Sequence, residues 1–187
     1  IALALTSCGS APKSEKKADA AAPSATSTAD LPDTEMMLLD NFEDGMYFYG
    51  VGDSWDSWGS HNLGLSADLS TDWKSDGEYS IKCVHEAVGA NSSGMATFCC
   101  DSPIETDWTG YKTFALDVYN PGETTLSITV QLQCTDTQNV EPGETKTLVF
   151  DIKGFKDDNL SDVKRIMLSN MGSDYAVMYF DNLRIFK

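Results

Sequence analysis

Short runs in which apolar and polar residues alternate constrain the fold of this chain more than any other feature. Between Lys112 and Tyr119 the side chains of Phe114, Leu116 and Val118 fall on one face. The next run alternates over residues 124–134, and its apolar face holds Leu126, Ile128, Val130, Leu132 and Cys134. Residues 120–123 (Asn-Pro-Gly-Glu) and 141–144 (Glu-Pro-Gly-Glu) have the composition of turns. Period-two alternation between turns is typical of β-strands with one buried face.

The whole pattern predicts an all-β domain. We expect strands at residues 36–43, 46–50, 61–69, 78–87, 95–100, 111–119, 124–134, 145–152, 163–170 and 176–186. No segment has a convincing 3.6-residue apolar stripe beyond two turns. Many short strands without helices favour a two-sheet antiparallel β-sandwich. The length of residues 35–187 suits a jelly roll better than a seven-stranded immunoglobulin-type domain.

The first residues are similar to the end of a secretion signal. Residues 1–7 are an apolar stretch that ends in small residues, and Leu5-Thr6-Ser7-Cys8 resembles the lipobox of bacterial lipoproteins. This interpretation makes residues 1–7 the C-terminal part of a signal peptide and Cys8 the lipidated residue. The protein would then be exported and held at the bacterial cell envelope by acyl chains alone. A chance cysteine at an irregular N-terminus is the alternative.

Residues 8–34 are predicted to be the lipidated cysteine followed by a disordered linker. After Cys8 they are mainly Ala, Ser, Lys, Thr, Pro and Asp, with Leu31 as the only large apolar residue. Such a segment cannot bury enough surface to offset its ordering entropy. We therefore expect a tether that precedes the domain at residues 35–187.

The charge of the chain excludes one large class of partners. It has 13 Lys and Arg against 29 Asp and Glu, a formal net charge of −16. A surface of this sign repels phosphate backbones, so we expect no nucleic-acid partner. No uninterrupted apolar run approaches the ~20 residues of a membrane-spanning helix.

The cysteines and histidines do not form a recognisable catalytic or metal motif. In an exported protein Cys83, Cys99, Cys100 and Cys134 allow three disulfide connectivities, or they are small buried apolar residues, which we favour. Only one of the adjacent pair Cys99 and Cys100 can face the core. His85 shares strand parity with Ile81 and Cys83 and is expected to be a structural residue.

Four segments, taken in order, resemble a known family. They are residues 38–45 (Leu-Leu-Asp-Asn-Phe-Glu-Asp-Gly), 75–82 (Ser-Asp-Gly-Glu-Tyr-Ser-Ile-Lys), 107–114 (Asp-Trp-Thr-Gly-Tyr-Lys-Thr-Phe) and 179–186 (Tyr-Phe-Asp-Asn-Leu-Arg-Ile-Phe). This order is similar to that of the jelly-roll, galactose-binding-like carbohydrate-binding modules found beside bacterial glycoside hydrolases. In that family the position of Trp108 is a packing residue, whereas Trp73 could serve packing or binding.

The resemblance implies a structural Ca²⁺ ion where the first and last strands meet. Its ligands would be Glu43, Asp76, Glu78 and Asp181, as side-chain carboxylates or through neighbouring carbonyl groups. Calcium prefers six to eight oxygen ligands, and clustered carboxylates need a cation between them. The alternative is that Glu43 and Asp181 accept hydrogen bonds from turn amides.

The resemblance also implies a sugar site on one sheet or at its rim, in which aromatic rings stack on pyranose C–H faces. The aromatic candidates are Tyr47, Tyr49, Trp55 and Trp58, although such a loop can also plug the end of a sandwich. Asp117, Tyr119, Gln131 and Gln133 are candidates for a groove floor on neighbouring strands, or belong to an ordinary solvated face.

These observations favour non-catalytic binding of a polysaccharide or oligosaccharide by a surface-tethered lipoprotein. A protein-interaction lipoprotein with the same fold is the main alternative, because aromatic loops also form protein-binding hot spots. A small jelly-roll glycoside hydrolase or lyase is less favoured, because no catalytic carboxylate pattern stands out. Protein partners are not identified by the sequence.

Overall fold

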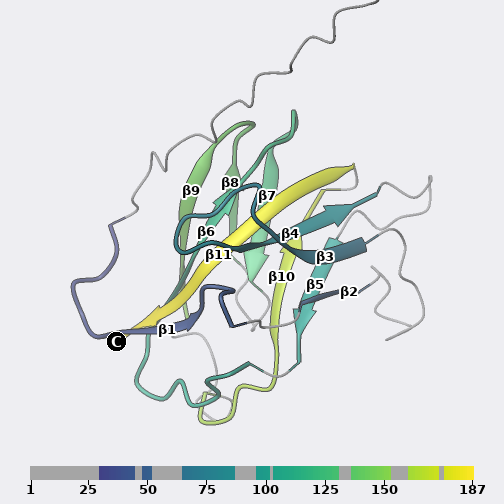
Figure 1. Cartoon of the computed structure of the whole chain (residues 1–187). Helices are drawn as coiled ribbons and strands as arrows, with labels where there is room; N and C mark the ends of the chain where they lie inside the picture. Colours follow the sequence, from purple (N-terminus) through teal and green to yellow (C-terminus); the bar gives the residue numbers. More distant parts are fainter. Residues whose placement is uncertain are drawn as a thin grey trace, which may run out of the picture.

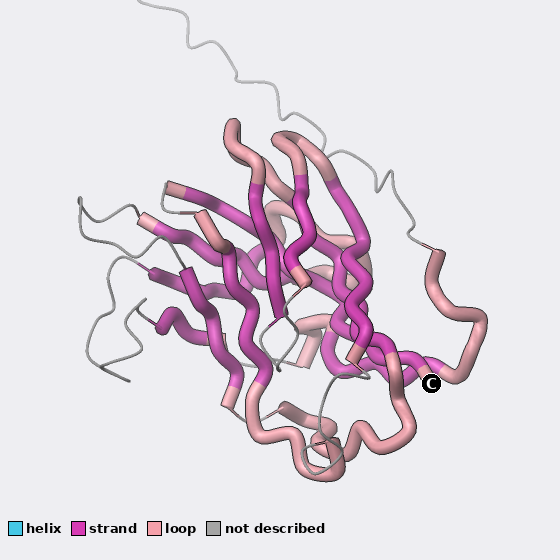
Figure 2. The backbone as a smooth tube through the Cα atoms, turned by 180° about the vertical axis from the view of Figure 1, so that it is seen from behind, coloured by secondary structure: helices cyan, strands magenta, loops and turns pink. Residues whose placement is uncertain are grey.

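The computed structural model describes residues 30–44, 48–51, 65–86, 96–101, 103–130, 136–152, 160–172 and 175–187. In this part of the chain every regular element is a β-strand (Figure 2), and no helix suited to crossing a membrane is found. The strands are β1 (Met36–Asp40), β2 (Tyr49–Val51), β3 (Leu65–Ser70), β4 (Ser80–His85), β5 (Ala96–Cys100), β6 (Thr113–Tyr119), β7 (Leu126–Val130), β8 (Thr137–Val140), β9 (Thr145–Asp151), β10 (Ile166–Asn170) and β11 (Ala176–Phe186).

The strands form two antiparallel sheets that pack face to face (Figure 1). Sheet A has the order β3-β4-β11-β6-β9, and β1 pairs with the C-terminal half of β11. Sheet B has the order β2-β5-β10-β7-β8. Sequence neighbours such as β6 and β7 therefore lie in different sheets, as in a jelly roll. The expected all-β antiparallel sandwich is confirmed.

The core lies between the sheets and is built from the alternating positions that the sequence singled out. Phe114, Leu116 and Val118 of β6 face Leu126 and Ile128 of β7 across this layer, and all five are buried. Full burial of each such side chain stabilises the fold by about 1.5–3 kcal/mol. Trp108 is also fully buried and stacks on Phe114, with 5.9 Å between ring centroids, so its expected packing role is confirmed.

The three cysteines of the described region are buried. Cys83 and Cys100 belong to the core, whereas Cys99 points to the other side of β5, as the adjacent pair required. Cys83, Cys99 and Cys100 form no disulfide with one another. Burial raises the pKa of the Cys99 thiol to about 11. Cys134 lies outside the described residues.

One strand was not predicted, and several are shorter than expected. β8 is a four-residue edge strand in which only Val140 is buried, so it has no apolar alternation that could mark it in the sequence. β7 is described only as far as Val130, before the predicted end at residue 134. The ends of strands are set by pairing partners rather than by local composition.

Candidate functional site

The outer face of sheet B, here called the sheet B surface, carries polar side chains where alternation turns them away from the core. Inward positions of β5 hold Ala96, Phe98 and Cys100, so Thr97 and Cys99 face outward. The same alternation turns Ser169 of β10 and Thr129 of β7 outward, because Leu168, Ile128 and Val130 belong to the core. Tyr49 of β2 is directly opposite Cys99 and shares its face.

Four hydroxyl side chains form a row across the sheet B surface. Thr97 pairs with Ser169, Ser169 with Thr129, and Thr129 with Thr137, each on the neighbouring strand. The hydroxyl oxygens of Thr97 and Ser169 are 2.8 Å apart, within hydrogen-bond distance. Thr97, Ser169 and Thr129 are buried, and the Thr129 hydroxyl donates to the carbonyl oxygen of Asp136, so only Thr137 of this row is exposed.

An aromatic ring and an ion pair lie at the β2 edge of the sheet B surface. Tyr49 is 45% exposed, and its hydroxyl donates a hydrogen bond to Asp101. Asp101 also accepts a hydrogen bond from the Nε atom of Arg165, which closes a three-residue cluster. The hydrogen bond to Asp101 raises the pKa of Tyr49 to about 12. Burial opposes the charge on Asp101, but the hydrogen bonds from Tyr49 and Arg165 hold its pKa below the usual range.

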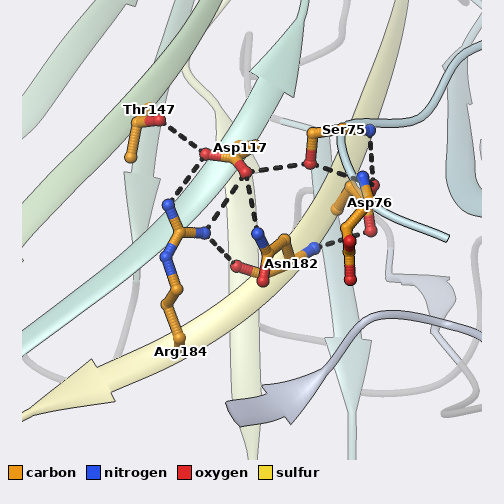
Figure 3. A network of polar contacts seen from close by, with 7 residues as sticks. Ser75, Asp76, Asp117, Thr147, Asn182 and Arg184 are labelled. Atoms are coloured by element: carbon orange, nitrogen blue, oxygen red, sulfur yellow. Dashed lines mark hydrogen bonds and ion pairs between the residues drawn. The ribbon is translucent and has the colours of Figure 1, made fainter. Parts of the chain in front are cut away.

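The outer face of sheet A is different, because a network of buried polar contacts fastens the 71–79 loop to it (Figure 3). Asp117 of β6 forms a bidentate pair with Arg184 of β11, with N–O distances of 3.1 and 3.3 Å. The same carboxylate accepts hydrogen bonds from the Thr147 hydroxyl (2.6 Å) and the Asn182 amide (3.2 Å). The Ser75 hydroxyl of the loop is 2.8 Å away. Both Asp117 oxygens are thus engaged within the protein.

Asp181 holds the same loop through backbone amides. Its Oδ2 atom accepts hydrogen bonds from the backbone N–H groups of Ser75 (2.7 Å) and Asp76 (3.0 Å). Its Oδ1 atom accepts from the N–H of Asn182, which has a φ of 54° at the irregularity between β11 and β6. The side chain is fully buried, and this burial raises its pKa although the amide hydrogen bonds oppose the shift.

Aromatic packing completes the attachment of the 71–79 loop. Trp73 is buried, and its ring stacks on Tyr119 of β6 with 5.6 Å between centroids. Tyr179 of β11 packs beside both rings, at 6.2 Å from Trp73 and 5.9 Å from Tyr119. Trp73 therefore has a packing role in this structure.

The structure brings together few of the residues predicted to bind a ligand. Tyr49 stands exposed on the sheet B surface, and its role in binding stays a prediction. Asp117 and Tyr119 belong to sheet A, whereas β7, which leads toward Gln131 and Gln133, belongs to sheet B. Gln131 and Gln133 are not among the described residues, so a groove floor of these four residues stays a prediction. Tyr47, Trp55, Trp58, Gln131, Gln133 and Cys8 lie outside the described residues.

Two of the predicted calcium ligands, Glu43 and Asp181, direct carboxylate oxygens at backbone amide hydrogens. Glu43 Oε1 accepts from the backbone N–H groups of Glu78 (2.7 Å) and Tyr79 (2.9 Å), much as Asp181 binds those of Ser75 and Asp76. Asp76 and Glu78 thus contribute amide donors to these contacts. Within the described residues no group of three or more acidic, histidine or cysteine side chains is arranged to hold a metal ion. This donor set does not fit a cation, and calcium stays a prediction from the resemblance.

Several residues of the sheet B surface were missed by the sequence reading. The run Ala96-Thr97-Phe98-Cys99-Cys100 could have indicated two of them, because Thr97 and Cys99 alternate with core residues and so face outward. The convergence of Tyr49, Asp101 and Arg165 had no sequence signal. These residues come from segments 52 and 64 positions apart.

Comparisons with known proteins give structural likeness without sequence likeness. No protein-family model and no curated protein sequence matches the chain. A family 11 carbohydrate-binding module from Clostridium thermocellum, solved with a β-1,3-1,4-mixed-linked tetrasaccharide, has a TM-score of 0.58 at 10% identity, over 81% of this chain and 95% of that one.

Two further solved structures are similar to the same extent. The module CBM27-1 from Caldicellulosiruptor saccharolyticus, solved with mannohexaose, has a TM-score of 0.57 at 16% identity, over 81% of this chain and 97% of that one. A family 22 xylan-binding domain has a TM-score of 0.52 at 12% identity, over 83% and 96% of the two chains. The chain therefore has the jelly-roll sandwich fold that these carbohydrate-binding modules share.

Proposed function

We propose that the protein binds a neutral polysaccharide or oligosaccharide, without cleaving it, on the sheet B surface. One observation carries the proposal: the exposed Tyr49 ring, fixed by Asp101 and Arg165, stands on the outer face of sheet B. The likeness of the fold to modules solved with bound saccharides supports the same ligand class.

The chemistry of this surface suits a saccharide. A tyrosine ring offers a flat apolar face to the C–H groups of a pyranose, and its hydroxyl hydrogen bond holds the ring in place. With its pKa near 12, Tyr49 is uncharged at neutral pH and its ring keeps this role. Asp101 and Arg165 offer an acceptor and a donor to sugar hydroxyls. A net charge of −16 favours neutral over acidic glycans.

The protonation state of Asp101 supports binding over hydrolysis. A glycoside hydrolase needs a carboxylic acid with a raised pKa that donates a proton to the leaving group. The pKa of Asp101 is shifted downward, and the side chain is paired with Arg165. Asp101 is therefore suited to accept hydrogen bonds from a bound sugar and unsuited to protonate one.

Affinity electrophoresis of the full chain tests the proposal. We expect mixed-linkage β-glucan, xylan or mannan in the gel to retard the protein, and Tyr49→Ala to weaken binding about tenfold or more because the stacking surface is lost. Tyr49→Phe keeps the ring and should retain most of the retardation. Tyr79→Ala, which removes another exposed ring outside the sheet B surface, is the matched control.

Two results would contradict the proposal. Failure of every neutral polysaccharide to retard the wild-type chain would favour the protein-interaction alternative. Equal retardation of wild type and Tyr49→Ala, with both melting at the same temperature, would move the binding site away from Tyr49. Trp55→Ala and Trp58→Ala, made in parallel, test the two tryptophans that the sequence predicted to bind.

The proposal includes attachment of the domain at the bacterial cell envelope through lipidated Cys8. It is supported by the lipobox-like segment Leu5-Thr6-Ser7-Cys8 and by the composition of residues 9–34. Mass spectrometry of the protein expressed in a bacterium checks this part. Acyl chains on Cys8 would support it, and an unmodified Cys8 would remove the anchor without affecting the binding proposal.

A further inference from the structure

A hollow lies at the end of the sandwich remote from the C-terminus. It has a volume of about 490 Å³ and lies between the β6–β7 connection and the start of β11. In Figure 1 this is the end at which β11 starts, and the C-terminus lies at the opposite end. The volume falls within the range of about 300–1,000 Å³ that small-molecule pockets occupy.

One wall of this hollow is rigid before any ligand arrives. Asn120 is fully buried, and its side-chain amide donates to the carbonyl oxygens of Thr124 (2.8 Å) and Val140 (2.9 Å). Its Oδ1 atom accepts from the N–H of Gly122 at 2.9 Å. These bonds fix the 120–124 turn, so a ligand would not have to order it on binding.

Among the described residues, the lining combines aromatic rings with one acidic side chain. The ring of Tyr175 is 59% exposed, and the nearly buried Tyr179 forms part of the floor. Pro121 and Val177 add apolar surface, and Glu123 provides the carboxylate. Apolar rings with one convergent acceptor suit a ligand that has C–H faces and hydroxyl groups. The carboxylate disfavours an anion, as does the net charge of the chain.

This hollow is separate from the sheet B surface. Val177 and Tyr179 project from the outer face of sheet A, since Met178 and Phe180 belong to the core. Tyr49, Asp101 and Arg165 lie on the outer face of the other sheet, with the core between the two groups. The two surfaces can therefore be changed independently.

We infer that this end pocket is a second saccharide site, which binds a mono- or disaccharide unit such as the end of a neutral glycan chain. That the ligand is a saccharide rests on the proposed function. The position of this second site and the size of the sugar unit that fits it are new. Tyr175 is the stacking ring, Glu123 accepts hydrogen bonds from a pair of sugar hydroxyls, and Asn120 is a positioning residue. The 120–124 turn bounds one side of this pocket, which suits the end of a glycan chain better than its length, whereas an open sheet face can bind several successive sugar units.

Amide chemical-shift mapping on the full chain separates the two sites. We expect the disaccharides cellobiose, xylobiose and mannobiose, or one of them, to shift the backbone amides of Gly122, Thr124 and Val177. Tyr175→Ala should weaken this binding about tenfold, and Glu123→Gln should weaken it several-fold. Both variants should leave the shifts of Thr97 and Ser169, produced by longer mixed-linkage oligosaccharides, unchanged. Tyr79→Ala is the control for loss of an exposed ring.

The outcomes distinguish this inference from the proposed function. Shifts on the sheet B surface without shifts in the end pocket, at disaccharide concentrations that saturate the former, would overturn the end pocket alone. Shifts confined to the end pocket and lost in Tyr175→Ala would establish it and overturn the sheet B site. The absence of shifts at both places would overturn both. Glucuronate that binds the end pocket as tightly as the neutral sugars would refute the role given to Glu123.

Discussion

Asp117 shows how a polar residue at an outward strand position can be structural rather than functional. Two N–H groups of Arg184 and the side chains of Ser75, Thr147 and Asn182 occupy its two oxygens. Little hydrogen-bonding capacity is left for a ligand. By contrast, Tyr49 is 45% exposed, and within the described residues only its hydroxyl is engaged in a hydrogen bond. A binding residue is thus recognised by the exposed surface and the hydrogen-bonding capacity that remain after folding. These depend on tertiary contacts, so the sequence alone does not give them.

Replacement of Asp117 tests its structural role. Asp117→Ala should lower the free energy of unfolding by about 3–5 kcal/mol, because Arg184 is then left buried without its partner. Urea unfolding followed by fluorescence measures this loss. The double variant Asp117→Leu with Arg184→Met should recover part of it. If Asp117→Ala unfolds like wild type but loses glycan binding, the residue belongs to a site after all.

The sequence located most strands but not their neighbours. The runs around Phe114 and Leu126 alternate strictly, and both form strands where predicted. β8 was not predicted, because only Val140 of its four residues is buried and the segment therefore has no apolar alternation. Which sheet a strand joins depends on contacts between distant residues, and no single run contains that information. For this reason the sequence did not show that β6, which holds Asp117, and β7 belong to different sheets.

The 71–79 loop is an element that no local pattern predicted, and Gly77 tests how it is fastened. Gly77 has a φ of 62°, and a Cβ atom added there would lie 2.3 Å from Glu43 Oε1. Gly77→Ala should therefore lower the free energy of unfolding by about 2 kcal/mol or more, from backbone strain plus the loss of the Glu43 hydrogen bonds.

Gly143→Ala is the matched control for this prediction. Gly143 has a φ of 73°, but nothing lies within 4 Å of an added Cβ atom. Gly143→Ala should lower the free energy of unfolding only by the strain of an alanine with a left-handed backbone conformation, about 1–2 kcal/mol. Differential scanning calorimetry compares the two variants. Equal melting temperatures would show that Glu43 does not clamp the loop.

At the scale of the whole molecule, the domain closes where β1 meets β11 and the 71–79 loop is fastened beside them. Because Glu43 and Asp181 bind amide hydrogens there, we expect EDTA to leave the melting temperature of the full chain unchanged. Calorimetry with and without EDTA measures this. A fall of several degrees that Ca²⁺ reverses, and Mg²⁺ does not, would establish the calcium ion that the family resemblance implies and would require ligands beyond the described residues.

The ends of the described domain are held together, since Lys187 donates its N–H to the carbonyl oxygen of Glu35 at 3.1 Å and pairs with its carboxylate at 2.9 Å. β11 begins beside the end pocket and ends at this closure. Its eleven residues span roughly 36 Å at about 3.3 Å per residue. If residues before 30 fix the domain to a surface and a glycan pulls from the far end, the traction acts along β1. Its ladder bonds to β11 lie across that direction and resist in shear, all at once, instead of peeling one after another. The order of the strands thus lets this domain resist a mechanical load applied along β1.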